Sequence, residues 1–388
     1  MGSESIVFSI FLIFSGAAVV SSFALFTRQP LIVGYIVLGA LFGPYGLDLV
    51  SDSNTLEQIS HIGIVFLLFL LGLDLQPRNF GKLIGRSAIV TITSGLVLCL
   101  IGTSISHALG MQWIESVLIG VSLMFSSTII GIKLLPTTML HHKRTGEVII
   151  TILLIQDGLA IVTLVLLSGT DHFDDLTAWL GVAIALPALM LGARYAVRWV
   201  ILPLLMKFDR FHEYIFLLAI GWCLGLAELS QALGLSLEIG AFIAGVSLAN
   251  SPIAQYIAVN LKPLRDFFLI LFFFSIGAGF DLGLIKEIWL GAVLLTLAVL
   301  ILKPYLHAKL LITLGEPKSM SWEAGFRLGQ TSEFSLLIAF IASSQGLIGV
   351  VASHVIQATA ILTFLISTYI VVFRYPTPIA VSDRLRRD

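Results

Sequence analysis

The stretch from Ile149 to Val162 reads IITILLIQDGLAIV, and a single carboxylate, that of Asp157, interrupts an otherwise apolar run. An ionised Asp at the centre of a bilayer costs about 2.5–3.5 kcal/mol even on lenient insertion scales. Such a residue is therefore rare unless it faces a partner or a water-filled cavity. A proton and a small cation neutralise the same charge, so an Asp in this place can exchange one for the other.

The composition indicates a polytopic membrane protein. The chain has 388 residues, of which 57% are hydrophobic and 12% are charged, and its mean hydropathy is +1.01. Ordinary soluble domains are about 25% charged, and a soluble fold could not hide this much apolar surface. The net charge of -1 excludes a broadly basic nucleic-acid binder.

The apolar runs predict the fold class, an all-α polytopic membrane protein with thirteen transmembrane helices. Each run has the roughly 17–25 residues that a membrane span needs. The runs lie at about 6–26, 31–47, 59–75, 87–109, 114–139, 147–168, 176–199, 212–229, 234–250, 264–281, 287–314, 322–345 and 348–373. We expect a single transmembrane transporter domain over 1–388, with short loops and no soluble regulatory domain.

The loops predict the orientation in the membrane. If the N-terminus is outside, every Lys and Arg falls in an inner loop or tail except Lys133, Lys286, Lys303 and Arg327. Cytoplasmic loops carry such an excess of Lys and Arg. We therefore expect a multi-pass protein of the inner (plasma) membrane, with its N-terminus outside and its C-terminus in the cytoplasm.

The two halves of the chain resemble each other. Three pairs of strings match in the same order, at offsets of 201, 207 and 205 residues: GALFG at 39–43 with GAFIAG at 240–245, GLDL at 72–75 with GFDL at 279–282, and SST at 126–128 with TSE at 331–333. Partners are seven helices apart and so cross the membrane in opposite directions, as inverted repeats of transporters do. Chance similarity of Gly-rich helices is the alternative. We expect one repeat over about 1–168, a connecting helix at about 176–199 and a second repeat over about 212–373.

Two runs carry a polar interruption at mid-membrane, at 125–128 and at 329–333. Unwound helix at that depth is tolerated only where protein or a wet cavity satisfies the freed backbone groups, and the exposed half-helix ends can bind ions. Hydroxyl and carbonyl oxygens suit alkali cations rather than soft metals. The alternative is that these hydroxyls only join packed helices. With Asp157 nearby, we take Asp157, Gln156, Ser127 and Thr128 as the candidate site for an alkali cation and a proton.

Six strings together resemble the second monovalent cation:proton antiporter family, from the first helix to the last. They are GPYGL at 43–47, GLDL at 72–75, SST at 126–128, QD at 156–157, GLSLEIGAF at 234–242 and GQTSEF at 329–334. That family includes Kef-type potassium/proton transporters and bacterial sodium/proton antiporters. The resemblance implies an NhaA-like antiporter fold, in which the runs at 114–139 and 322–345 cross at their unwound centres beside the Asp. It also implies a homodimer in which a core domain moves against a dimerisation domain.

Further residues are candidates for coupling or for compensating helix dipoles. Lys303 lies in the sequence LKPY, and related antiporters place a Lys or Arg in this helix. It is either a switching partner of Asp157, a compensator of half-helix dipoles, or a side chain that snorkels to an interface. The other candidates flank the two interruptions: Glu333, Lys133, Thr331 and Ser332. For Gln156 two roles stay open, an amide oxygen on the ion or a hydrogen bond to a neighbour.

The function expected is exchange of K⁺ or Na⁺ for H⁺ by alternating access, and not an enzyme activity. The Gln-Asp pair follows the Kef-type pattern, whereas electrogenic relatives carry Asp-Asp, so exchange should be electroneutral. The expected partners are the lipid bilayer, a second copy of the chain, monovalent cations and a separate regulatory subunit, without cofactor or nucleic acid. The alternatives are a gated potassium efflux channel, a sodium symporter on the same fold, and an intramembrane aspartyl protease, which needs two adjacent carboxylates.

Overall fold

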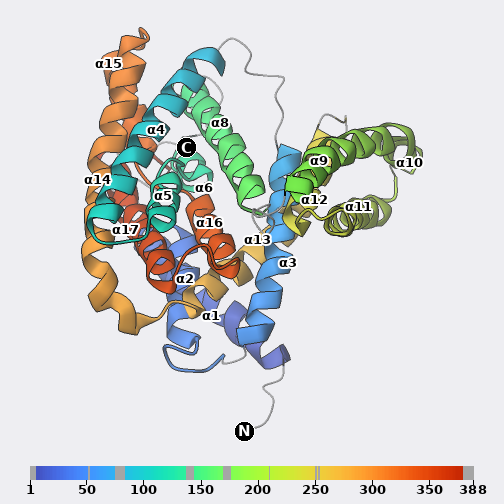
Figure 1. The fold of residues 1–388 in the computed structure, drawn as a ribbon, viewed down its shortest axis with the longest axis horizontal. Helices are drawn as coiled ribbons and strands as arrows, with labels where there is room; N and C mark the ends of the chain where they lie inside the picture. The colour runs from blue at the N-terminus through green and yellow to red at the C-terminus, as the bar shows by residue number, and fades with distance from the viewer. Residues whose placement is uncertain are drawn as a thin grey trace. The chain divides into compact units, whose positions relative to one another are not determined.

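The computed structural model describes residues 6–50, 53–74, 84–136, 144–168, 176–208, 210–249, 251 and 254–378. The regular elements in these ranges are helices (Figure 1), so the expectation of an all-helical chain is confirmed there. The helices belong to two compact units.

The first unit comprises Met1–Ser51, Phe80–Val162 and Ile276–Asp388. Its helices are α1 (Ile6–Phe26), α2 (Leu31–Phe42), α4 (Ile84–Ala108), α5 (Trp113–Ser122), α6 (Thr128–Lys133), most of α8 (Arg144–Ser168), η4 (Leu282–Leu284), α14 (Ile285–Thr313), α15 (Lys318–Arg327), α16 (Glu333–Ser344) and α17 (Val350–Arg374). Helix α14 packs against α4, α15 and α17, and α16 packs against α5 and α17 (Figure 1).

The second unit comprises Asp52–Asn79 and Thr163–Ser275. Its helices are α3 (Ser53–Asp74), α9 (Leu176–Ala196), the π-helical turn η3 (Val197–Ile201), α10 (Leu202–Lys207), α11 (His212–Ala232), α12 (Leu237–Ala249) and most of α13 (Ala254–Ala278). Glycines let α3 and α12 approach closely, because a Cβ on Gly245 would overlap the carbonyl oxygen of Phe69 and one on Gly72 would overlap that of Phe242. Two of the Gly strings noted in the sequence are therefore packing points.

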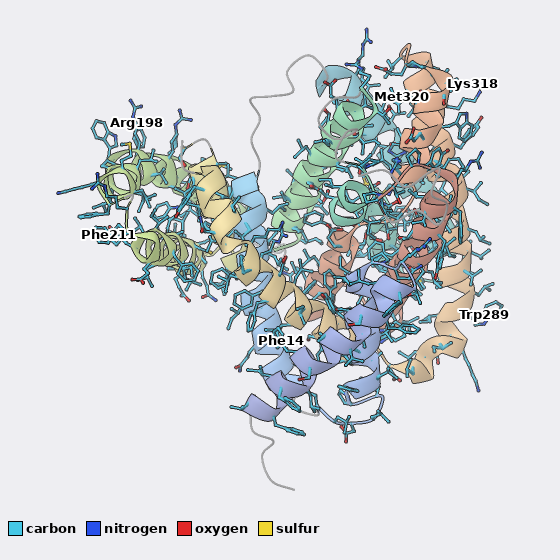
Figure 2. All side chains as sticks on the ribbon, turned by 180° about the vertical axis from the view of Figure 1, so that it is seen from behind. Phe14, Arg198, Phe211, Trp289, Lys318 and Met320 are labelled. Atoms are coloured by element: carbon cyan, nitrogen blue, oxygen red, sulfur yellow. The ribbon has the colours of Figure 1, made fainter. Side chains whose placement is uncertain are left out.

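Seven described helices are long and apolar enough to cross a membrane: Val7–Phe26, Gly85–Ala108, Arg144–Leu164, Ile184–Lys207, Glu213–Ala232, Leu282–Thr313 and Val350–Arg374. Large apolar side chains such as Phe211 and Trp289 are exposed and project outward (Figure 2). Such faces suit lipid, whose tails are as apolar as leucine. The chain is thus a polytopic membrane protein. All thirteen expected runs overlap described helices, but thirteen spans, and their orientation, stay a prediction.

Several boundaries differ from those expected, among them the starts of α3 at Ser53 and of α13 at Ala254, which lie before the expected 59 and 264. Two of the differences have a local cause. Helix α2 ends at Phe42 rather than near 47, because the chain turns at Gly43, where a Cβ would lie 2.6 Å from Cα of Ala278. The run expected to end at 199 continues through η3 and α10 to Lys207. Pro203 lies just after η3, and its missing N–H removes one helical hydrogen bond, which fits a local change from α- to π-helical pairing.

The two runs with polar interruptions are each divided into two short helices, as the sequence indicates. Helix α5 ends at Ser122 and α6 begins at Thr128, while α15 ends at Arg327 and α16 begins at Glu333. The second helix of each pair begins at Thr128 and at Glu333, and these two positions are 205 residues apart. The boundaries proposed for the inverted repeats stay a prediction.

Candidate functional site

Asp157 lies on α8 with only 2% of its surface exposed. The hydroxyl of Thr128, the first residue of α6, donates to the carboxylate and lies 3.0 and 2.9 Å from its two oxygens. This donor is neutral, so it orients the carboxylate without cancelling its charge. Among the described residues, no Lys or Arg forms an ion pair with Asp157.

The amide of Gln156 pairs with the backbone where α5 gives way to α6. Its Oε1 accepts a hydrogen bond from the backbone N–H of Ser126 at 3.1 Å, and its Nε2 donates to the carbonyl of Met124 at 3.4 Å. Both ends of the amide are therefore engaged by the unwound segment. Of the two roles left open by the sequence, this geometry favours the hydrogen bond to a neighbour.

The two unwound segments bond to each other across the first unit. The N–H of Ser127 donates to the carbonyl of Thr331 at 2.9 Å. The hydroxyl of Ser126 donates to the carbonyl of Leu328 at the end of α15, at 2.9 Å. In return, the hydroxyl of Ser335 on α16 donates to the carbonyl of Ser122 at the end of α5, at 2.6 Å. Each interrupted helix thus satisfies a backbone carbonyl that the other leaves free.

Serine caps the second half of each interrupted helix. The side chain of Ser127 accepts from the N–H of Ile130, and that of Ser332 accepts from the N–H of Phe334. Glu333 is the first residue of α16, where the partial positive charge of a helix N-terminus favours a carboxylate. It is close enough to Asp157 for the two carboxylates to repel each other. Two acidic groups therefore share this part of the unit.

The ammonium of Lys303 is surrounded by backbone carbonyls. Lys303 lies on α14 with 0% exposure, and its Nζ donates to the carbonyls of Leu123, Phe125 and Gln330 at 3.1, 2.5 and 2.9 Å. These carbonyls belong to the unwound segments and to the end of α5. All three ammonium donors are thereby used. The side chain does not reach an interface, so snorkelling is not what the structure shows.

Polar side chains of α17 support the same segments. Thr363 lies 2.8 Å from the hydroxyl of Thr331, and Ser367 donates to the side-chain oxygen of Gln330 at 3.0 Å. The amide nitrogen of Gln330 lies 3.5 Å from the carbonyl of Ser127. The sequence reasoning left out Thr363 and Ser367, although hydroxyls four residues apart on an apolar helix were a usable signal.

The structure gathers most of the residues chosen from the sequence in one place in the first unit. They are Asp157, Gln156, Ser127, Thr128, Thr331, Ser332, Lys303 and Glu333. Lys133 is the last residue of α6, and its side chain lies outside the described part of the structure. The backbone carbonyls that accept hydrogen bonds from Lys303 were not predicted. Every residue has a carbonyl, and only the fold determines which of them converge on this side chain.

Apart from the ammonium of Lys303, the gathered side chains offer carboxylate, hydroxyl and amide oxygens, and the carboxylate of Asp157 is held by a neutral hydroxyl. Carboxylate and hydroxyl oxygens suit hard cations such as Na⁺ and K⁺. A cluster of three or more His, Cys, Asp or Glu side chains that could hold a metal ion does not occur among the described residues. The site therefore fits a transported alkali cation or a proton.

Comparison with known proteins agrees with this chemistry. The chain matches the family described as "Sodium/hydrogen exchanger, transmembrane" over residues 10–374. It is 30% identical over 328 residues to K(+) efflux antiporter 5 of Arabidopsis thaliana, covering 81% of this chain and 57% of that one. It is 31% identical over 320 residues to the glutathione-regulated potassium-efflux system protein KefC of Klebsiella pneumoniae, covering 79% of this chain and 50% of that one. The chain thus spans about half the length of the curated relatives it matches.

A solved structure shares the fold. The sodium proton antiporter MjNhaP1 from Methanocaldococcus jannaschii, solved at pH 8, matches with a TM-score of 0.67 at 16% identity, over 93% of this chain and 94% of that one. The likeness shows that the two chains have the same fold.

Proposed function

This chain belongs to the sodium/hydrogen exchanger family, and from that premise we propose that it exchanges a monovalent cation, K⁺ or Na⁺, for a proton across a membrane. The observation that supports the proposal is the carboxylate of Asp157, which is buried in an apolar helix. Among the described residues, its hydrogen bonds come from one neutral hydroxyl, that of Thr128. A buried charge of this kind needs a compensating cation or a proton. Either one neutralises it, so each excludes the other.

Competition at one carboxylate couples the two fluxes. The carboxylate of Asp157 is neutralised whether it binds the cation or the proton. A site neutralised in this way can be moved between the two faces of the membrane more readily than one with an uncompensated charge. Gln156 occupies the neighbouring position with an uncharged amide that is engaged by the backbone of 124–126. One cation is then exchanged for one proton, and the cycle moves no net charge.

Lys303 takes the role of compensating the half-helix dipoles in this scheme. Helix C-termini carry partial negative charge, and the ammonium donates to carbonyls at the end of α5 and in both unwound segments. Its charge stays in place through the cycle. Glu333 compensates the partial positive charge at the N-terminus of α16.

The transport cycle proposed is alternating access, in which a core domain moves against a second domain in each subunit of a homodimer. The division of the chain into two compact units, with the site in one of them, supports this. The N-terminus would lie outside and the C-terminus in the cytoplasm. A separate regulatory subunit is a further proposed partner.

Proton flux driven by a cation gradient tests the proposal. The purified chain is placed in proteoliposomes, and K⁺, Na⁺ and Li⁺ are compared with the membrane potential either clamped or left free. We expect flux with K⁺ or Na⁺ that does not change with the potential. Cation flux without counterflow of protons would contradict exchange and indicate the channel alternative instead. Flux driven by the potential would contradict electroneutrality.

A further inference from the structure

Arg327, the last residue of α15, is a fully enclosed guanidinium with 1% of its surface exposed. Its Nε and Nη2 donate to one carboxylate oxygen of Glu323 at 3.1 and 2.8 Å. Its Nη1 donates to the carbonyl of Leu134 at 2.8 Å, and its Nη2 also donates to the carbonyl of Pro376 at 2.7 Å. Glu323 balances the charge and orients the guanidinium, and the two carbonyl bonds join it to two other segments.

These two carbonyls belong to segments that matter for the site. Leu134 is the C-cap of α6, and Pro376 comes immediately after Tyr375, the C-cap of α17. Helix α6 has only six residues, and a helix that short is not stable by itself in isolation. It depends on partners at its two ends.

The other end of α6 carries the contact with the proposed ion site. Its first residue, Thr128, donates to both oxygens of Asp157. A six-residue helix is roughly 9 Å long, which is less than two turns, so its two ends are closely coupled. A shift at Leu134 is therefore passed to Thr128, and with it to the donor that orients Asp157.

We propose that Arg327 is a positioning residue for the ion site: it holds α6 from its C-terminal end, sets the place of Thr128 against Asp157, and ties that setting to the segment that leaves α17. This inference rests on the function proposed above for Asp157. It does not require Arg327 to touch the cation or the proton.

The geometry explains why an arginine stands here. The planar guanidinium directs four of its five N–H groups at three partners that come from different segments, two of them at Glu323. A lysine keeps the charge but has a single nitrogen that cannot span them. Arg327→Lys therefore removes the fixed geometry while it leaves the charge of the site unchanged.

Two measurements on the full-length chain test the proposal, with Arg374→Lys as the matched control. The guanidinium of Arg374 lies 5.1 Å from the centre of the ring of Phe326, the residue that precedes Arg327. Unlike Arg327, Arg374 is exposed. Hydrogen–deuterium exchange reports on α6 through the amides of Gly131 and Leu134, which donate to Ser127 and Ile130. The KM for K⁺ or Na⁺ in proteoliposomes reports on the ion site.

We expect Arg327→Lys to speed exchange of the α6 amides and to raise KM, each roughly tenfold, the equivalent of one hydrogen bond to a charged group. The maximal rate should change little, and Arg374→Lys should change neither quantity. Unchanged exchange in α6 would overturn the proposal, and so would a loosened α6 with an unchanged KM. Equally faster exchange throughout α14 and α17 would also overturn it, because it would indicate a general loss of stability.

A second variant covers the case in which Arg327→Lys does not fold. Glu323→Gln keeps one acceptor for the guanidinium but removes the charge that holds it in place, so it should loosen α6 in the same direction by a smaller factor. Unchanged α6 exchange in the folded Glu323→Gln protein would contradict the proposal. Failure of the proposed function is separate, because it shows as absent cation/proton exchange in the wild-type chain, whereas the deuterium measurement needs no transport.

Discussion

Two buried charges of the site are held in opposite ways. Among the described residues, the carboxylate of Asp157 accepts hydrogen bonds from one neutral hydroxyl, that of Thr128. The ammonium of Lys303 meets three backbone carbonyls. We infer that the carboxylate of Asp157 is available to bind either a cation or a proton, while the ammonium of Lys303 stays bound to the backbone.

Replacing Lys303 should affect stability more than the charge moved in each cycle. In Lys303→Gln, the amide has two donors and no charge, so at least one buried carbonyl loses its partner. We expect the free energy of unfolding to fall by on the order of 2 kcal/mol, the scale of one unsatisfied buried polar group. A thermal shift assay measures the loss. If the variant keeps its melting temperature but its transport becomes sensitive to the membrane potential, Lys303 carries charge in the cycle instead.

Adding a carboxylate beside Asp157 should change the electrical character of transport. Gln156→Glu keeps the shape of the side chain and the acceptor for the N–H of Ser126, but it replaces the donor to Met124 with an oxygen. The second carboxylate adds a negative charge that a further proton or cation can neutralise. We expect exchange to become dependent on an imposed potential, measured as proton flux with the potential clamped at several values. Flux that still ignores the potential would show that electroneutrality has another origin.

At this scale the sequence revealed charged and polar side chains but not their backbone partners. Asp157, Lys303 and the hydroxyls near Ser127 and Thr331 stand out because polar groups are costly in an apolar run. The carbonyls around Lys303 carry no such signal, since every residue has one. Arg327 was noted only as a basic residue outside the inner loops, because its partners Leu134 and Pro376 are far apart in the sequence.

The interrupted helices are the elements on which the site is built. Both α5–α6 and α15–α16 have an interrupted backbone, and each supplies a serine hydroxyl to a carbonyl of the other. The same segments also join through the N–H of Ser127 and the carbonyl of Thr331. We infer that the two interruptions form one structural unit, which agrees with the proposed crossing of the two helices.

Removing either serine hydroxyl should destabilise this pair of elements. Ser126→Ala and Ser335→Ala each leave a buried carbonyl with one partner fewer, and each should lower the free energy of unfolding by about 1–2 kcal/mol. Because both bonds join the same two elements, the double variant should lose less than the sum. Ser22→Ala is the control, since that exposed hydroxyl bonds only to Ala18 in its own helix. Full additivity in the double variant would show that the two interruptions are independent.

Element positions were largely predictable, because their signals are local. Runs of apolar residues located the helices, and the strings SST and TSE located the two breaks. The early end of α2 at Gly43 depends on the close approach of Ala278, and this long-range contact has no local signature. The π-helical turn before Pro203 is a similar case, since Pro predicts a disturbance but not its form.

At the scale of the whole molecule, the division into two units was beyond the reach of the sequence pattern. The expected repeats follow chain order, whereas each unit combines segments that are far apart in the chain. The chain belongs to the sodium/hydrogen exchanger family, shares the fold of MjNhaP1, and spans about half the length of the curated relatives it matches. For the molecule as a whole, we infer that one cation displaces one proton from Asp157.

Proton release on cation binding tests this claim most directly. The purified chain in weak buffer is mixed with K⁺ or Na⁺, and the change in pH is recorded for the wild type, for Asp157→Asn and for Asp281→Asn. Asp281 is the matched control because its side chain accepts from the N–H of Gly283, and Asn can do the same. We expect release of roughly one proton per chain from the wild type and from Asp281→Asn, and none from Asp157→Asn. Equal release from Asp157→Asn, or no release from the wild type with either cation, would contradict it.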